Sequence, residues 1–431
     1  MDKDILQPDN AGSGVLPVNI GTPPWRSEKR VMLRYSGIID PKDIDACIAR
    51  ANAYAGLDKA LHAEASSLIE AITKAGIMDE AGAAGARLRT CREVSADEKY
   101  VIGVAFDGDP GALTSRALML SNPHIVLEGL LINMCIAGAR HGIICVDETD
   151  AGVMYLTVRA LGQMSEYGLL GANVLGTDFS ADIEIRAIKP SPVLAEESAL
   201  VRYLQGGQAL PYLHEAAAPL IYNDAPAVVF TAETLAEVAA LFREDKLPAD
   251  GVTGTQIITV HDGEKKYVVE VPRGILSGAL LDDIEARAGN RETVKMYRLG
   301  GIGGGFFRGN KRDMPVDFRG TAAGTAGGPG VMMIYRGDVA VPAVVKEAMD
   351  YLREQSCGQC VFCREGTMQI SLILGEMLEK KADIEDIDLL EEIAGYMKIG
   401  CICRYGANAA EPVRSSLQEF RGEYEACLKN R

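Results

Sequence analysis

The feature that most constrains this chain is a run of closely spaced cysteines near its C-terminal end. Cys357, Cys360 and Cys363 stand three residues apart, and Cys401 and Cys403 follow further along. Iron–sulfur clusters are held by four cysteine thiolates, which a C-x2-C-x2-C run and one remote cysteine commonly supply. We therefore expect a [4Fe–4S] cluster, with three ligands from the tight run and the fourth from Cys403.

Two other roles for these cysteines compete with the cluster. Structural zinc usually takes cysteines in C-x2-4-C pairs, often with histidine, whereas this chain has a triplet and no histidine after His261. Disulfides need an oxidising compartment, and the first ten residues have neither the basic nor the apolar segment of a signal peptide. The spacing thus favours the cubane, with zinc as the alternative.

The composition limits the class of protein. The chain has 431 residues, of which 48% are hydrophobic, so it can form several globular domains. Its net charge of −16 argues against nucleic acid and anionic membrane surfaces as partners. The longest apolar region, residues 125–139, contains Glu128 and is shorter than a membrane span of about 20 residues. We expect a cytoplasmic protein with no inserted segment.

The first half of the chain has the pattern of an α/β domain. Residues 1–30 show no periodicity and are interpreted as an extended arm, and residues 31–35 as a short strand. Residues 55–76 have the apolar spacing of a helix. Strands and helices then alternate from residue 99 to 206, which predicts a mostly parallel sheet with a ligand at the carboxyl ends of its strands.

A small α+β domain is expected next. Its strand–turn–strand pattern includes Asp262-Gly263, a favourable hairpin turn. The glycine-rich residues 300–309 do not have the spacing of a phosphate-binding motif and are interpreted as a loop. The expected elements are strands 255–260 and 267–271, helix 279–288, and strands 294–299 and 331–335.

The remainder of the chain predicts a helical bundle whose connections carry the cysteines. The expected helices are 344–355, 367–379, 384–397 and 411–428. The predicted organisation is an arm at 1–30, an α/β domain at 31–225, an α+β domain at 226–338 and a bundle at 339–431.

Several stretches resemble a known family. They are SCGQCVFCREG, CRYGANAAEPV, DPGALTSRALMLSNPHIVLEGLLI and LLGANVLGTDFSADIEI. They look like the NADH-binding flavoprotein (51 kDa-type) subunits of respiratory complex I and the diaphorase subunits of related hydrogenases and formate dehydrogenases. The resemblance implies a flavin domain, a ubiquitin-like (β-grasp) domain and a four-helix bundle with one [4Fe–4S] cluster. It implies Cys357, Cys360, Cys363 and Cys403 as ligands, whereas Cys401 stands where the family has none.

The flavin loop is where the chain departs from this family. The family's G-R-G-G-A-G-F-P-T-G-x-K segment corresponds to DEAGAAGARLRT, residues 79–90. Most glycines, which let the backbone approach a cofactor closely, are replaced. Asp79 and Glu80 place negative charge where a phosphate would lie. Arg87 and Arg89 are the side chains of this stretch that could still bind phosphate.

Other parts of the family's flavin and nucleotide site are only partly retained. The G-E-E-T motif corresponds to Ala195-Glu196-Glu197-Ser198, and N-N-V-E-T to residues 230–234. The weakened FMN/NADH site is therefore expected to include Glu196, Glu197 and Arg87, although the two glutamates could be ordinary surface residues of a helix. Two interpretations stay open, a degenerate flavin site and a site that holds FMN through altered contacts.

Three functions are compatible with this sequence. The first is an iron–sulfur electron-transfer subunit of a multi-subunit cytoplasmic oxidoreductase whose own FMN/NADH site does not work. The second is a diaphorase that moves electrons between NAD(P)H, FMN and the cluster. The third is an assembly subunit with a structural cluster. The expected partners are a thioredoxin-like [2Fe–2S] subunit and a multi-cluster Fe–S, dehydrogenase or hydrogenase subunit, because this chain lacks those modules.

Overall fold

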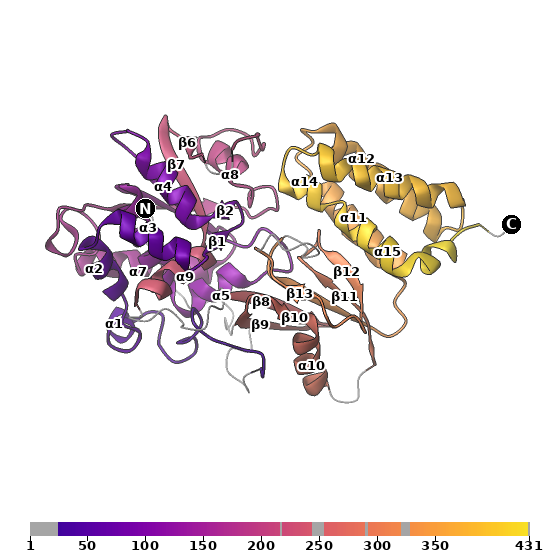
Figure 1. Ribbon diagram of the computed structural model, residues 1–431, viewed down its shortest axis with the longest axis horizontal. Coiled ribbons are helices and arrows are strands. Elements are labelled where there is room, and N and C mark those ends of the chain that lie inside the picture. Colours follow the sequence, from indigo (N-terminus) through magenta and orange to yellow (C-terminus); the bar gives the residue numbers. More distant parts are fainter. Residues whose placement is uncertain (1–24, 216–217, 244–253, 289–291, 320–327, 430–431) are drawn as a thin grey trace.

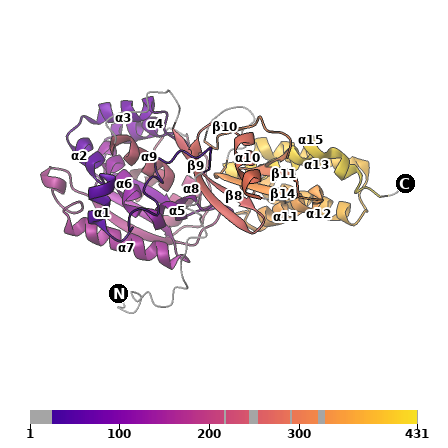
Figure 2. The same cartoon turned by 90° about the horizontal axis from the view of Figure 1, so that it is seen from below.

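The computed structural model describes residues 25–215, 218–243, 254–288, 292–319 and 328–429. They form an elongated molecule with three regions (Figure 1). An α/β region forms one end and a helical region the other. A second sheet lies between them when the molecule is viewed from below (Figure 2).

The first region is built on a five-stranded sheet with the order β5-β4-β3-β7-β6. All neighbouring strands are parallel except β6 and β7. The strands are β3 (Tyr100–Ala105), β4 (His141–Asp147), β5 (Asp182–Ile188), β6 (Leu220–Tyr222) and β7 (Ala225–Thr231).

Helices cover both faces of this sheet, and a short hairpin at residues 78–83 leads directly into the helix Ala84–Glu93. Alternate residues of β3 explain the two cores, since Val101 packs into one core and Ile102 into the other. The other elements of the region are α1 (Ile44–Ala51), α2 (Ala55–Leu61), α3 (Ala65–Lys74), β1 (Met78–Asp79), β2 (Gly82–Ala83), α4 (Ala84–Glu93), α5 (Thr114–Ser121), α6 (Pro123–Ala137), α7 (Ala151–Glu166), the short 3-10 helix Val174–Gly176, α8 (Glu197–Leu204) and α9 (Ala232–Arg243).

Helix α6 is the centre of the larger core and packs tightly on α9. Gly129 makes this approach possible, because a Cβ atom at its position would lie 1.9 Å from the carbonyl oxygen of Leu235. The described part of the chain contains no single helix that is long and apolar enough to cross a membrane; α5 and α6 reach that length and composition only as a pair, bent by 103°.

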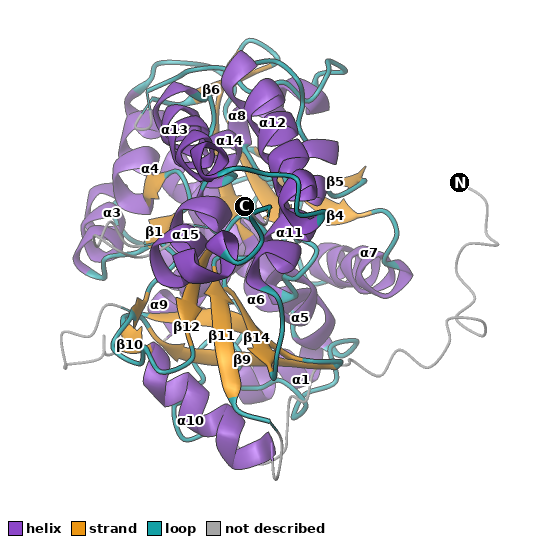
Figure 3. Ribbon diagram, turned by 90° about the vertical axis from the view of Figure 1, so that its right-hand side faces the viewer, coloured by secondary structure: helices purple, strands orange, loops and turns teal. Residues whose placement is uncertain are grey.

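The second region is a mixed sheet with the order β12-β11-β14-β8-β9, in which β14 and β8 are parallel. The sheet lies between α10 and the helical region (Figure 3). Tyr297 and Phe307 on one face pack on α10, and Met296 and Phe306 pack into the core of the helical region. The elements are β8 (Thr255–Asp262), β9 (Lys265–Pro272), β10 (Ile275–Leu276), α10 (Ser277–Ala288), β11 (Val294–Leu299), β12 (Gly305–Arg308), β13 (Pro315–Val316) and β14 (Val331–Arg336).

The helical region contains α11 (Val341–Glu354), α12 (Val361–Leu378), α13 (Ile384–Gly400), α14 (Arg404–Asn408) and α15 (Glu411–Glu425). Four of them pack in a closed ring, with α11 on α12, α12 on α13, α13 on α15 and α15 on α11. Helix α14 is a single short turn between α13 and α15, at the end that faces the first region (Figure 1).

Residues 31–35 do not form the expected strand. Their backbone instead turns around the buried carboxylate of Glu270, which accepts hydrogen bonds from the amides of Val31 at 2.9 Å, Met32 at 3.1 Å and Leu33 at 2.9 Å. A side chain thus takes the place of a neighbouring strand. This long-range partner, on β9, is not visible in the local sequence pattern.

Three further expectations need correction. Residues 55–76 form two helices, α2 and α3, rather than one. Helix α12 begins at Val361, before the expected start at residue 367, so that Cys363 lies in its first turn. The predicted domain change between residues 225 and 226 comes too early, because β7 pairs with β3 and α9 packs on α6 in the first region. Residues 1–24 of the expected arm lie outside the described residues.

Candidate functional site

Two connections of the helical region carry the cysteines. Cys357 and Cys360 lie between α11 and α12, and Cys401 and Cys403 between α13 and α14. The first loop is organised by Ser356, whose Oγ accepts a hydrogen bond from the amide of Gly358 and lies 3.3 Å from Cys363 Sγ.

The two connections bring five thiols together. A Cβ atom added at Gly406 would lie 2.9 Å from Cys401 Sγ and 3.2 Å from Cys363 Cβ, so these two cysteines are neighbours. The charges of Cys357 and Cys363 also act on Cys403. The interaction with neighbouring Cys401 lowers the pKa of Cys363 to about 7, whereas burial raises the pKa of Cys403 to about 12. The triplet and the remote pair, which are separate in the sequence, therefore form one constellation.

The arrangement fits a cluster better than a single ion. Among the described residues, no group of three His, Cys, Asp or Glu side chains is placed to hold one metal ion. A cubane is bound at its corners, so its ligands lie around a larger body and need not converge on one point. Four or more soft thiolate donors with no histidine among them are also the donor set of an iron–sulfur cluster.

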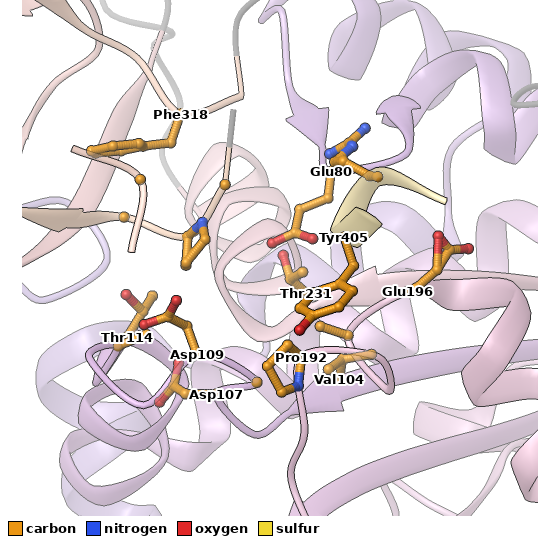
Figure 4. A pocket seen from close by; sticks show the side chains of 18 of the residues that line it. Glu80, Val104, Asp107, Asp109, Thr114, Pro192, Glu196, Thr231, Phe318 and Tyr405 are labelled. Atoms are coloured by element: carbon orange, nitrogen blue, oxygen red, sulfur yellow. The ribbon is translucent and has the colours of Figure 1, made fainter. Parts of the chain in front are cut away.

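A cavity of about 300 Å³ lies beside these loops, where the three regions meet. In Figure 4, Glu80, Thr231 and Tyr405 lie close together, and Asp107, Asp109 and Thr114 lie on another side. The carboxylates that line the cavity are Asp79, Glu80, Asp107, Asp109, Glu196, Glu197 and Glu233, and the basic side chains are His214, Arg319 and Arg404. The lining is therefore predominantly acidic.

The stretch expected to replace the flavin loop forms one edge of this cavity. Met78 pairs with Ala83 and Asp79 with Gly82, so β1 and β2 make a tight hairpin with Glu80 and Ala81 at its turn. Both turn residues line the cavity. Burial and the neighbouring Asp79 raise the pKa of Glu80 to about 7. The turn of this hairpin therefore presents the carboxylate of Glu80 to the cavity, rather than the exposed backbone of a glycine loop.

Arg87 does not face the cavity as a free cation. It is 4% exposed, donates to the carbonyl oxygen of Val229 at 2.8 Å, and forms a buried ion pair with Glu197. Asp79 lies 3.7 Å from the same guanidinium, and Glu197 also pairs with His214 at 3.1 Å. Burial raises the pKa of Glu197 to about 7 even though Arg87 opposes this shift.

The carboxylates of Glu196 and Asp107 accept hydrogen bonds from backbone amides at helix starts. Glu196 caps α8 by accepting from the amide of Ser198 at 3.2 Å. Asp107 accepts from the amides of Ser115 at 2.9 Å and Arg116 at 3.1 Å, at the start of α5. Free N–H groups at a helix start are a common site for phosphate, and here the protein's own carboxylates take them.

The cavity and the cysteines share a wall. Arg404, Tyr405 and Asn408 of α14 line the cavity directly after Cys403, and the Tyr405 hydroxyl donates to the carbonyl oxygen of Leu352 at 2.5 Å. Arg319 was not anticipated, although it pairs with Glu233 at the cavity. Its position after β13, a short strand that pairs only with β10, gives no local signal, whereas adjacency to Cys403 could have indicated Arg404 and Tyr405.

The structure thus treats the two expected sites, the cysteine constellation and the FMN/NADH site, differently. The structure brings Cys357, Cys360, Cys363 and Cys403 together, with Cys401 as an additional member. It also places Glu196 and Glu197 at the cavity, but Arg87 is buried outside the lining and pairs with Glu197, while Glu196 caps α8.

Comparison with known proteins gives one match in the first region and another in the helical region. Residues 72–240 match the Nuo51 FMN-binding domain, and residues 343–427 match the NADH-ubiquinone oxidoreductase-F iron-sulfur binding region. The NADP-reducing hydrogenase subunit HndC of Solidesulfovibrio fructosivorans is 28% identical over 93% of this chain and 84% of its own length. The F subunit of the NADH-quinone oxidoreductase of Streptomyces coelicolor is 28% identical over 89% of this chain and 87% of its own length.

The fold itself is also found in a solved structure. An NAD+-reducing [NiFe]-hydrogenase in the H2-reduced state superposes with a TM-score of 0.76 at 21% identity, covering 94% of this chain and 68% of the hydrogenase chain. At this identity the match establishes the multidomain arrangement of sheets and helices.

Proposed function

Because the chain belongs to the family of NADH-binding flavoprotein subunits of respiratory complex I and related hydrogenases, we propose that it is an electron-transfer subunit of a multi-subunit oxidoreductase. Cys357, Cys360, Cys363 and Cys403 hold one [4Fe–4S] cluster, which accepts and passes on single electrons. The observation that carries this proposal is the gathering of these thiols at two adjoining loops.

The chain's own groups favour thiolates at this site. Burial raises the pKa of Cys357 and of Cys403, and the backbone groups of Gln359 and Gly406 act in the opposite direction, toward the thiolate. Cys363 lies in the first turn of α12, where the positive end of the helix dipole supports negative charge. These contacts stabilise the ionised sulfurs that metal ligation requires.

We further propose that the cavity does not hold FMN. Phosphate would meet the carboxylates of Glu80, Asp107 and Asp109, and the nearby amide donors of α5 are already satisfied by Asp107. Arg87, the expected phosphate partner, is buried against Glu197. No lysine lines the cavity within the described residues to replace it. We therefore derive no hydride-transfer step for this chain.

A diaphorase is the second candidate function. It is favoured by the match to an FMN-binding domain and by the retention of a 300 Å³ cavity beside the cysteines. Such a protein would transfer electrons between NAD(P)H, FMN and the cluster. The acidic lining makes this candidate the weaker of the two.

Other subunits are expected as partners, because the relatives are subunits of multi-subunit hydrogenases and quinone oxidoreductases. We expect a thioredoxin-like [2Fe–2S] subunit and a multi-cluster Fe–S or dehydrogenase/hydrogenase subunit, in the cytoplasm. The acidic chain would pass electrons to whichever of them approaches the cysteine loops.

Reduction of the purified chain separates the two functions. In the full chain purified without oxygen, dithionite should reduce the cluster, as seen by loss of visible absorbance and by electron paramagnetic resonance (EPR), whereas NADH should not. Cys403→Ser should lose the cluster, whereas Cys401→Ser should retain it. Reduction by NADH would favour the diaphorase, and zinc in place of iron would exclude both functions.

A further inference from the structure

Among the described residues, no strand pairs with the outer edge of β5 (Asp182–Ile188). On its inner side β5 is parallel to β4, in a register that runs through all seven of its residues without a bulge. The strand contains no proline. A long regular edge of this kind is a ready template for another strand unless the protein protects it.

The other three edges of the two five-stranded sheets are protected. Strand β6 is only three residues long, and β12 packs against α15. Along β9, the carbonyl oxygen of Glu270 accepts a hydrogen bond from the amide of Lys29 at 2.7 Å, so that edge is covered by the segment that contains Lys29. Short edge strands and covering segments are usual protections against unwanted pairing. Strand β5 is longer, and only its last residue is fully buried.

The backbone bonds of β5 show which residues face outward. The amide of Asp182 and the carbonyl oxygen of Ile188 bond to the backbone at the two ends of β4, at 2.9 Å each. Alternate residues of a strand direct their backbone groups to opposite edges. Since Ala181 is already paired with Gly171, the free edge begins after it. The residues that present N–H and C=O groups on this edge are Ile183, Ile185 and Ala187.

The side chains of β5 suit a second copy of the same strand. Glu184 and Arg186 lie on one face, with side chains 57% and 39% exposed, and their charged groups are 2.9 Å apart. The guanidinium of Arg186 also lies 3.4 Å from the hydroxyl of Tyr222. On the other face, Ile183 and Ile185 are only partly buried at the margin of the larger core. A strand laid beside β5 would cover both isoleucines and face both charges.

One antiparallel register satisfies these side chains. With Ile185 opposite Ile185 of the second copy, Glu184 lies opposite the second copy's Arg186, and this pair occurs twice by symmetry. Sliding one strand by two residues would place either Glu184 opposite Glu184 or Arg186 opposite Arg186. Like charges directly opposite each other are destabilising. The charge pattern therefore favours a second copy of this chain as the occupant, in a single register.

We propose that β5 pairs antiparallel with β5 of a second copy of this chain, centred on Ile185, so that the two five-stranded sheets become one continuous sheet. The three outward-facing residues of each copy would form about six backbone hydrogen bonds across the interface. Because only one strand of each copy makes the contact, the interface is small and the dimer should dissociate on dilution. This pairing is independent of the proposed electron-transfer function.

The first test is sedimentation velocity of the full chain over a series of concentrations, in which wild type should dimerise. Glu184→Arg and Arg186→Glu should each weaken dimerisation about tenfold, because each places like charges opposite each other at two symmetric positions. The double variant Glu184→Arg/Arg186→Glu restores opposite charges and should dimerise like wild type. Glu70→Arg, at an exposed position of α3, is the control for the change in net charge and should have no effect.

Crosslinking tests the register directly. In a hydrogen-bonded antiparallel pair, opposite Cα atoms lie about 5.5 Å apart, a separation that a disulfide can bridge. Ile185→Cys treated with oxidised glutathione should therefore yield a covalent dimer that a reducing agent cleaves. Ala187→Cys, on the same face of the same strand, is the matched control and should not crosslink, because its two copies would lie about 14 Å apart along the strands. Wild type, with its ten native cysteines, sets the background.

The other outcomes would overturn the proposal. A chain that stays monomeric at every concentration would do so, and so would a dimer that keeps its affinity in both single charge variants, because it would use another surface. Failure of the charge-reversed double variant to dimerise, or crosslinking through Ala187→Cys instead of Ile185→Cys, would contradict the register centred on Ile185. The charge variants change exposed side chains, so they remain decisive even if Ile185→Cys fails to fold.

Discussion

At the residue scale, the cavity is lined by carboxylates that neighbouring cations stabilise to different degrees. Asp79 has a pKa below its usual value because Arg87 and Arg319 outweigh the effect of burial. Glu80, the next residue, has its pKa raised to about 7 by burial and by Asp79. Two adjacent carboxyl groups at one hairpin thus differ in protonation near neutral pH, because Arg87 lies 3.7 Å from Asp79, whereas at Glu80 burial and the charge of Asp79 outweigh Arg404 and Arg319.

Glu80→Gln should change how stability depends on pH. The pKa of Glu80 in the folded chain, about 7, lies above its ordinary 4.5, so its stabilising contribution is complete below about pH 4.5 and is lost as pH rises through 7. Relative to wild type, the variant should gain stability above pH 7, by an amount on the order of 3 kcal/mol at most. Urea unfolding at pH 5 and pH 8 measures this difference, and an equal difference at both pH values would contradict it.

Arg87 provides a second test at this scale. Arg87→Met removes the cation buried between Glu197 and Asp79 and should destabilise the fold by about 3–5 kcal/mol, because an unpaired carboxylate remains buried. The double variant Arg87→Met/Glu197→Gln should recover part of this loss, as measured by denaturant unfolding. A cost below about 1 kcal/mol for the single variant would mean that Arg87 is free to bind an anion.

At the scale of elements, the first region depends on the close approach of α6 and α9. Gly129→Ala should destabilise the protein by about 1–3 kcal/mol, since the added methyl group would overlap the carbonyl oxygen of Leu235. Gly162→Ala on α7 is the matched control, because its position is exposed and has no atom within 4 Å. The control should be neutral or stabilising by up to about 1 kcal/mol. Equal melting temperatures for the two variants would contradict this packing.

Elements with strong local patterns were predictable from the sequence, and those fixed by distant partners were not. The hairpin of β8 and β9 and the helices around the cysteines follow from periodicity and turn residues. The segment 31–35 was misread because its amides bond to Glu270. Helix α4 (Ala84–Glu93) is not among the predicted elements, because residues 79–90, which contain most of it, correspond to the family's glycine loop.

In the site, too, local patterns were predictable from the sequence and contacts with distant partners were not. Spacing alone indicated the cysteine constellation, because the triplet is local and the chemistry of thiolates is specific. The inward direction of Arg87 could not be read from the sequence, since its partners Glu197 and Val229 lie on other elements. The nearness of Cys401 to Cys363 likewise depends on how α12 meets the connection between α13 and α14.

At the scale of the whole molecule, the cysteine loops lie at an apolar part of the surface. Ile399 is 82% exposed, and Val361, Phe362 and Tyr396 are also exposed nearby on α12 and α13. The ring of Phe362 packs on Gly400, beside Ile399. We expect the electron-transfer partner to bind here, because exposed apolar groups often mark protein interfaces.

Crosslinking within the native complex should therefore join residues 355–367 or 397–410 to another iron–sulfur subunit. Ile399→Glu should weaken retention of that subunit at least tenfold without lowering the iron content, because a charge would be buried at the interface; tenfold corresponds to about 1.4 kcal/mol. Leu372→Glu, at an exposed position further along α12, is the control and should leave retention unchanged. Purification of a fully active chain without any partner would argue against this surface.

The central claim is that this chain keeps the cluster of its family and lacks the flavin. It is tested most directly by measuring iron, sulfide and extracted FMN in the same sample of the full chain purified without oxygen. The account predicts about four iron and four sulfide per chain, with FMN well below one per chain. One FMN per chain together with bleaching of the flavin by NADH would contradict it.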